Sequence, residues 1–281
     1  MEIAPVVALG RALSGAALTR VTRLGLPLLG AEDFPRLAEG GVAVVHAFGV
    51  AAGEEVLPVA RIAGLRLIVS VEEGTPSRAL LEAAEHLLVP SRAAAQAIDA
   101  LRGPVGKVIV APYGVDLRPM RPRRAVPRGP LRVASVDGEG ATVLADAVAA
   151  ARRAEVDIEL VVASPEDLLE TIDRADLFAW WPTGAVPRLP PFLLEALASG
   201  VCVIAPREGV VPEAITSGIS GLLYRAGDPH GLLRVLLRAA RDPALRIALG
   251  AAGRVVAEID FDEARTCRRL GELYAGSIEP R

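Results

Sequence analysis

Cysteine and histidine are both scarce in this chain of 281 residues. Its two cysteines, Cys202 and Cys267, are too few for a disulfide framework, and Cys202 lies in an apolar run where a small buried side chain is expected. The three histidines, His46, His86 and His230, are scattered along the sequence. The sequence therefore predicts neither a disulfide-stabilised scaffold nor a metal site built on histidine and cysteine.

Long apolar runs and common nucleotide motifs are also missing. No uninterrupted stretch approaches the roughly 18 apolar residues of a membrane span, and the first residues carry Glu2 and Arg11 where a signal peptide would be apolar. There is no P-loop, no Gly-x-Gly-x-x-Gly and no Gly-x-Ser-x-Gly. The formal net charge of −3 offers no basic excess for nucleic acid. We expect a cytoplasmic protein, and peripheral membrane contact through arginine-rich surfaces stays open.

Apolar residues make up 52% of the chain, enough for one large or two modest domains. Apart from its first 40 residues, where we expect a helix over 6–18 and a strand over 21–29, the chain alternates short buried strands with helices, as parallel sheets require. Among these elements we expect a strand over 177–181 that contains both tryptophans, and helices over 141–153 and 229–241. A segment rich in proline and arginine separates two such series. The predicted division is a first lobe at 1–116, a hinge at 117–130, a second lobe at 131–258, and a C-terminal helix at 259–281 that packs back on the first lobe.

One stretch, 189–213, has the clearest organisation. Two prolines, Pro190 and Pro191, precede a short apolar helix that carries a single acid, Glu195, and that ends at Gly200. A continuous apolar run over 201–205 predicts a strand buried on both faces, and a polar loop follows it. Open α/β sheets bind ligands at the carboxyl ends of their strands, so this helix and loop are the first candidates for a site.

The segment LLEALASGVCVIAPREGVVPEAITSGISGLLYRAGD resembles the nucleotide-sugar half of GT-B glycosyltransferases, specifically glycosyltransferase family 4 (glycosyl transferases group 1). The shared pattern is Glu-Ala-x-Ala-x-Gly, a short strand, a loop of the Gly-x-Pro-Glu type, and a Gly-Leu-Leu strand. The segment VPSRAAAQAIDALRGPVGKVIVAPYGVD, residues 89–116, resembles the segment that closes the family's first lobe. The resemblance implies an α/β fold with two Rossmann-like, doubly wound parallel-sheet lobes facing a cleft, here with a shortened first lobe. It implies no metal and no cofactor.

The resemblance also implies a donor site in the second lobe. Glu195 matches the acid that binds the ribose; the alternative is a solvent-facing helix acid. Backbone N–H groups at the helix start would bind the diphosphate, and glycine loops lie beside it. The donor-binding candidates on this basis are Phe192, Leu193, Leu194, Gly209 and Gly138.

Two parts of the family's donor clamp are absent. The first acid of the pattern should lie eight positions before Glu195, where Pro187 stands. The loop that should supply two bases, 135–140, carries the acids Asp137 and Glu139 instead, and the single lysine, Lys107, belongs to the first lobe. Arg188 and Arg207 are candidate substitutes for the missing bases; the alternative is that both are surface arginines.

In the first lobe, GGVAVVHAF resembles the family's strand that ends in a histidine. This makes His46 the candidate catalytic residue, contacting the acceptor or the donor sugar. A histidine at the end of a strand is as often a structural residue.

The resemblance implies a retaining hexosyl-type glycosyltransferase that transfers a sugar from a nucleotide-diphosphate donor to an acceptor hydroxyl in glycan or glycoconjugate biosynthesis. The missing acid and bases leave a second hypothesis open, a GT-B-like protein that binds as a partner or assembly subunit of an active glycosyltransferase. A third is a small-molecule binder of another doubly wound family. The sequence names neither the nucleotide, the sugar nor the acceptor.

Overall fold

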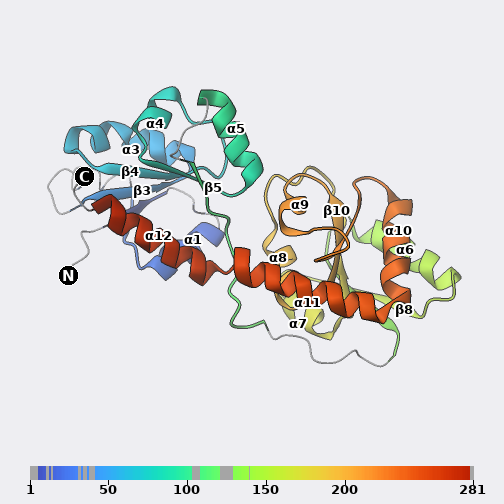
Figure 1. Cartoon of the computed structure of the whole chain (residues 1–281). Coiled ribbons are helices and arrows are strands. Elements are labelled where there is room, and N and C mark those ends of the chain that lie inside the picture. Colours follow the sequence, from blue (N-terminus) through green and yellow to red (C-terminus); the bar gives the residue numbers. More distant parts are fainter. Residues whose placement is uncertain are drawn as a thin grey trace. The chain divides into compact units, whose positions relative to one another are not determined.

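The computed structural model describes residues 6–10, 13, 15–30, 33, 37, 42–102, 108–120, 129–138 and 140–278. The chain divides into two compact units, Met1–Tyr113 with Glu263–Arg281, and Gly114–Asp262. Each unit has its own sheet, in which every pair of neighbouring strands is parallel (Figure 1). The predicted fold class, two α/β lobes with parallel sheets, is confirmed. The cleft between the lobes stays a prediction.

The first unit contains a six-stranded sheet in the order β2-β1-β3-β4-β5-β6. Its strands are β1 (Val6–Leu9), β2 (Leu28–Leu29), β3 (Val44–Phe48), β4 (Arg66–Ser70), β5 (His86–Val89) and β6 (Val108–Val110). Its helices are α1 (Gly15–Leu24), α3 (Val50–Ala63), α4 (Arg78–Ala83), α5 (Arg92–Arg102) and α12 (Glu263–Ile278).

Helices cover both faces of this sheet, because alternate residues of its strands are apolar on each side. Val45 and Ala47 of β3 pack with α3, α4 and α5 in one cluster, whereas Val44 of the same strand packs with α12. Phe48 packs with α1. Figure 1 shows α3, α4 and α5 on one side of the sheet and α1 with α12 on the other. His46, which alternates with Val45 and Ala47, therefore faces the α12 side.

The start of the chain differs from the prediction. Residues 6–9 form β1, which pairs with β3 from Val6↔Val44 to Leu9↔Ala47, and 15–24 form α1. Only Leu28–Leu29 of the predicted strand over 21–29 is extended. Short apolar runs fit a strand or a helix equally well, and here pairing with a strand more than 30 residues away decides the outcome.

The second unit contains a five-stranded sheet in the order β11-β10-β9-β7-β8. Its strands are β7 (Leu131–Val136), β8 (Ile158–Ala163), β9 (Leu177–Ala179), β10 (Cys202–Arg207) and β11 (Leu222–Arg225). Its helices are α6 (Ala141–Arg153), α7 (Leu168–Arg174), α8 (Pro191–Ala198), α9 (Val211–Ala214), α10 (Pro229–Arg241) and α11 (Pro243–Asp260). The proline and arginine segment at 117–130 falls within this unit, and its residues 121–128 lie outside the described residues.

Two apolar clusters enclose this second sheet. Phe178, Val203 and Ala205 pack with α7, α8 and α9 on one face, and Leu177 and Ile204 pack with α6 and α10 on the other. Figure 1 shows the same two helical layers on either side of the strands. The inner strands β9 and β10 are therefore buried on both faces apart from the terminal Arg207, as the continuous apolar run at 201–205 predicts, whereas the edge strand β8 exposes Val161 and Val162.

Candidate functional site

The carboxyl edge of the second sheet carries most of the predicted donor-binding residues. β9 lies between β10 and β7, and all three run parallel, so the segments that follow them meet at one edge. These segments are 137–140 after β7, 180–190 after β9, and 208–210 after β10. The structure thus brings Gly138, Arg188, Phe192 and Gly209 to one end of one sheet.

At Gly140 the segment after β7 contacts the segment after β9. It is buried at the start of α6, and a Cβ added there would lie 1.9 Å from the carbonyl oxygen of Trp181. Gly138, two residues earlier, has φ +147°, and its N–H donates to Oδ1 of Asp137 at 2.8 Å. The turn after β7 therefore presents exposed backbone and one carboxylate, with no basic side chain among its described residues; Glu139 lies outside them.

At Gly209 the turn after β10 contacts the segment after β9. Its φ is +50°, and an added Cβ would lie 1.9 Å from the carbonyl oxygen of Val186, which accepts a hydrogen bond from the N–H of Val210 at 3.2 Å. Only glycine combines this backbone conformation with so close an approach. The loop that contains Pro187 and Arg188 is therefore held in place by backbone contacts.

Replacing Gly209 with alanine is expected to lower the free energy of unfolding by about 2–4 kcal/mol, because backbone strain and a clash with backbone are both introduced. Gly218 has φ +82° and no atom within 4 Å of an added Cβ, so Gly218→Ala carries the strain alone, about 1 kcal/mol. Urea unfolding followed by tryptophan fluorescence measures both variants. Equal losses would show that the Val186 contact does not constrain the loop.

Glu195 lies in the middle of α8 and is half-buried. Burial raises the pKa of its carboxyl group above the ordinary value. No hydrogen bond or ion pair engages its side chain within the part of the chain that the structure describes. A partly desolvated carboxylate without a protein partner can accept hydrogen bonds from a polar ligand.

The start of α8 leaves few backbone donors for a ligand, because its first residue, Pro191, has no N–H. Its N-cap is Pro190, which makes no side-chain capping bond. Leu193 and Leu194 are buried in the core, and the N–H of Leu193 bonds the carbonyl of Pro190 at 3.0 Å. Phe192 is partly buried, with its ring 5.3 Å from Trp180 and 6.1 Å from Phe178. The side chains of Phe192, Leu193 and Leu194 thus anchor the helix in the core. A ligand at the start of α8 would be contacted by the backbone of these residues.

The two candidate replacements for the missing bases are both exposed. Arg188 stands two residues before Pro190, and Arg207 is the last residue of β10, paired with Arg225 of β11. Pro187 is exposed in the same loop. Pro187, which stands where the first motif acid is expected, therefore lies at the carboxyl edge of the second sheet but has no charged side chain.

Sequence reasoning missed an aromatic group at this edge. The strand β9 ends at Ala179, two residues earlier than predicted, so both tryptophans follow it. The ring of Trp181 stacks on Tyr224 with 5.3 Å between centroids and 7° between planes, and the Tyr224 hydroxyl donates to the carbonyl oxygen of Trp180 at 2.7 Å. The pair of adjacent tryptophans at a strand end was the available signal.

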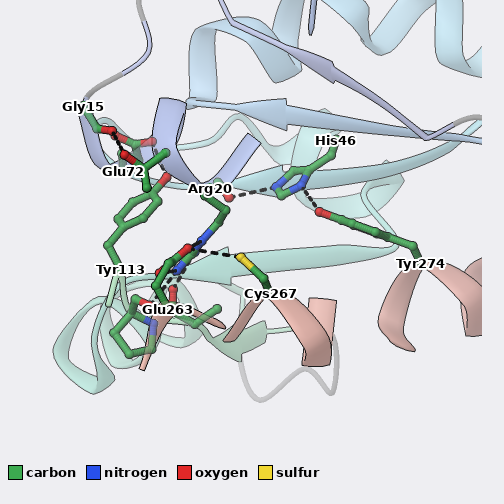
Figure 2. Close-up of polar contacts among 12 residues, drawn as sticks. Gly15, Arg20, His46, Glu72, Tyr113, Glu263, Cys267 and Tyr274 are labelled. Carbon is green, nitrogen blue, oxygen red and sulfur yellow. Dashed lines mark hydrogen bonds and ion pairs between the residues drawn. The ribbon is translucent and has the colours of Figure 1, made fainter. Parts of the chain in front are cut away.

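His46 belongs to the first unit, and the prediction that a strand ends at this residue is wrong. It is the third residue of β3 and has no exposed surface. Its Nδ1 lies 2.6 Å from the hydroxyl of Tyr274 and its Nε2 lies 2.8 Å from the hydroxyl of Ser70, as Figure 2 shows for Tyr274. Its ring stacks on Phe48 at 4.1 Å. Because both nitrogens are engaged inside the core, this geometry favours the structural alternative for His46 over contact with a sugar.

Across the residues that the structure describes, no group of three or more His, Cys, Asp or Glu side chains could hold a metal ion. Among the same residues, no helix combines the length and the apolar composition of a membrane span.

Part of the second unit matches a known protein family. Residues 135–242 match the family described as glycosyl transferases group 1. The amylovoran biosynthesis glycosyltransferase AmsK of Erwinia amylovora is 30% identical over 122 residues, which cover 41% of this chain and 30% of that protein. A GDP-mannose-dependent monoacylated alpha-(1-6)-phosphatidylinositol monomannoside mannosyltransferase of Corynebacterium glutamicum is 36% identical over 122 residues, which cover 41% of this chain and 31% of that protein. The chain thus spans under a third of these two relatives.

Solved structures match both units. Anabaena Alr3699/HepE in complex with UDP gives a TM-score of 0.78 at 14% identity, covering 97% of this chain and 100% of that one. A glycosyltransferase from Rickettsia africae gives 0.80 at 12% identity, covering 100% of both. At these identities the likeness shows the fold. The chain therefore has the GT-B fold, and its second unit is related to the group 1 glycosyl transferases.

Proposed function

We propose that this protein transfers a sugar from a nucleotide-diphosphate donor to an acceptor hydroxyl in glycan or glycoconjugate biosynthesis. The observation that carries the proposal is Glu195, a half-buried carboxylate without a protein partner within the described residues. It lies within the matched residues 135–242, on the helix whose sequence resembles the family's ribose-binding motif. Support also comes from the Anabaena structures, which contain UDP, UDP with glucose, and UDP-glucose.

In this proposal each group at the carboxyl edge has one task. The Glu195 carboxylate accepts hydrogen bonds from the ribose hydroxyls. The N–H of Phe192 at the start of α8 faces the diphosphate, where the helix dipole favours negative charge. Arg207 and Arg188 supply the positive charge that stabilises the leaving diphosphate as the bond to the sugar breaks. The transfer is proposed to retain the configuration at the sugar's anomeric carbon, which product NMR would test.

Nucleotide binding provides the first test, since both tryptophans of the chain lie at this edge and serve as reporters. Calorimetry and tryptophan fluorescence with UDP, GDP and ADP, and with their sugars, are expected to detect one preferred nucleotide. Replacing Glu195 with glutamine is expected to weaken that binding about 10- to 100-fold, the effect of one lost charged hydrogen bond. The control is Glu170→Gln on α7, an exposed carboxylate paired with Arg174, which should leave binding unchanged.

The absence of any binding at millimolar nucleotide would overturn the proposal. Binding of equal strength by the Glu195→Gln variant would instead overturn the role of this residue alone. Transfer is measured separately, as release of free nucleotide diphosphate in the presence of candidate acceptors.

A second candidate function is binding without transfer, as a partner of an active glycosyltransferase. Pro187 stands where the first motif acid is expected, and Asp137 where a base is expected, which favours this candidate. If it is right, Glu195→Gln should leave the cellular function intact, and the protein should co-purify with a second glycosyltransferase.

A further inference from the structure

One face of α10 carries a row of basic side chains. His230, Arg234, Arg238 and Arg241 are all exposed and are spaced by four, four and three residues, which places them on one side of the helix. At 1.5 Å per residue the row extends over about 16 Å. The opposite side of the helix is apolar and buried in the core of the second unit, through Leu232, Leu236 and Ala239 among others.

Acids balance only part of this row. Residues 229–241 contain none, although the whole chain carries a net charge of −3. Asp228 caps α10 through the N–H of Gly231 at 2.8 Å and also pairs with Arg234 at 3.3 Å, and Asp242 caps the next helix. Arg238 and Arg241 have no ion pair within the part of the chain that the structure describes.

Helix stability alone explains only part of the row. Arg238 and Arg241 lie in the last turn of α10, where cations are stabilised by the helix dipole. Arg234 lies in the middle of the helix, and the exposed Arg225 ends β11, the strand that packs against α10. The positive surface therefore extends beyond the positions that the dipole favours.

We propose that the exposed face of α10 docks on an anionic lipid bilayer. A straight row of long, flexible cationic side chains on a convex helix fits a flat charged surface. The apolar side of α10 is already buried, so the attraction is electrostatic, without insertion. Each arginine near an anionic leaflet adds a small, salt-sensitive attraction, so docking is reversible. This proposal does not depend on the proposed transfer reaction.

A second row of arginines provides a matched control. Arg265, Arg268 and Arg269 are exposed on α12, but Glu272 lies on the same face of that helix. Three arginines can thus be replaced on either helix with the same loss of charge.

The test is co-sedimentation of the full chain with phosphatidylcholine vesicles, with and without phosphatidylglycerol, at low and at high salt. The unchanged chain is expected to bind only the vesicles that contain phosphatidylglycerol, and to be released by salt. Replacing Arg234, Arg238 and Arg241 together with glutamine is expected to lower that binding about 100-fold. The triple glutamine variant at 265, 268 and 269 should retain most of it. Thermal unfolding of both variants checks that they fold.

Three outcomes would overturn the proposal. One is equal vesicle binding by the α10 variant and the unchanged chain. Another is an equal loss of binding in the α12 variant, which would indicate a response to net charge. The third is that the chain does not bind vesicles but binds duplex DNA or polyglutamate through the α10 arginines. That result would show that the partner of this face is not a bilayer.

Discussion

Replacing Glu263 with glutamine is expected to lower the free energy of unfolding by about 3–5 kcal/mol, because the buried guanidinium of Arg20 loses its counter-charge. Both side chains are almost fully buried, at 1% and 4% exposed. Nε and Nη2 of Arg20 donate to the two carboxylate oxygens of Glu263 at 2.6 and 2.8 Å, which is the bidentate geometry of strong charged pairs.

The other donors of Arg20 join further segments of the first unit (Figure 2). Nη2 also donates to the carbonyl oxygen of Pro112 at 2.8 Å, and Nη1 to that of Ala111 at 3.3 Å. The guanidinium carbon lies 4.2 Å from the centre of the Tyr113 ring, and the Tyr113 hydroxyl donates to Glu72 at 2.6 Å. Arg20 thus binds α1, the segment after β6 and the first residue of α12 together, so its unpaired charge would disturb all three.

A double-mutant cycle measures the pair. Arg20→Met should cost about as much as Glu263→Gln, whereas the two changes together should cost less than their sum, since the double variant leaves no buried charge. The surface pair of Arg132 and Glu159 is the control, with side chains 46% and 35% exposed. Glu159→Gln should cost at most about 1 kcal/mol.

Unfolding in urea would be followed by far-UV circular dichroism and by tryptophan fluorescence. Both tryptophans lie in the second unit, so fluorescence reports that unit, while circular dichroism reports both. In the Glu263→Gln variant we expect the circular dichroism transition to move to lower urea concentration by more than the fluorescence transition does. A loss no larger than that of Glu159→Gln would contradict the assigned role of the buried pair.

The regular elements of the second unit could be predicted from sequence because their signals are local. The predicted helices at 141–153 and 229–241 coincide with α6 and α10. For α10 the signal is a proline after the capping Asp228, followed by apolar residues at helical spacing. The apolar run at 201–205 likewise predicts β10 to within two residues.

Contacts between distant residues could not be predicted in this way. Arg20 and Glu263 lie 243 positions apart, and His46 and Tyr274 lie 228 apart. Nothing local in GGVAVVHAF distinguishes a histidine at the end of a strand from one inside it, since the run continues through Ala47 and Phe48. The same limit applies at the candidate site. Local sequence indicates the helix of Glu195, but the contact between Gly209 and Val186 arises only when two loops meet.

His46 is expected to make the protein less stable in mild acid. Burial, with a smaller contribution from the charge of Arg20, lowers the pKa of His46 to about 3. In the unfolded chain an ordinary histidine takes up a proton near pH 6.5. Between these two values the unfolded state binds more protons than the folded state, so the free energy of unfolding falls as the pH falls.

The size of this effect follows from the two pKa values. Stability is unaffected above about pH 7, and then decreases by up to about 1.4 kcal/mol for each pH unit below 6.5. We expect a loss of about 2 kcal/mol between pH 7.5 and pH 5, and about 4–5 kcal/mol by pH 3. Because other groups also titrate below pH 5, the contribution of His46 must be obtained as a difference between variants.

Replacing His46 with glutamine removes the titrating group and keeps an amide that can bond Tyr274 and Ser70. The variant should be less stable at pH 7.5, because the ring that stacks on Phe48 is lost. Its disadvantage should shrink by about 2 kcal/mol on going to pH 5, since only the unchanged chain pays the cost of keeping a histidine neutral. His230→Gln, at an exposed position of α10, serves as the control and should lie within about 0.5 kcal/mol of the unchanged chain at both pH values. A pH-independent difference between His46→Gln and the unchanged chain would show that the buried imidazole is protonated as readily as it is in the unfolded state, and that the hydrogen bonds with Tyr274 and Ser70 open in solution.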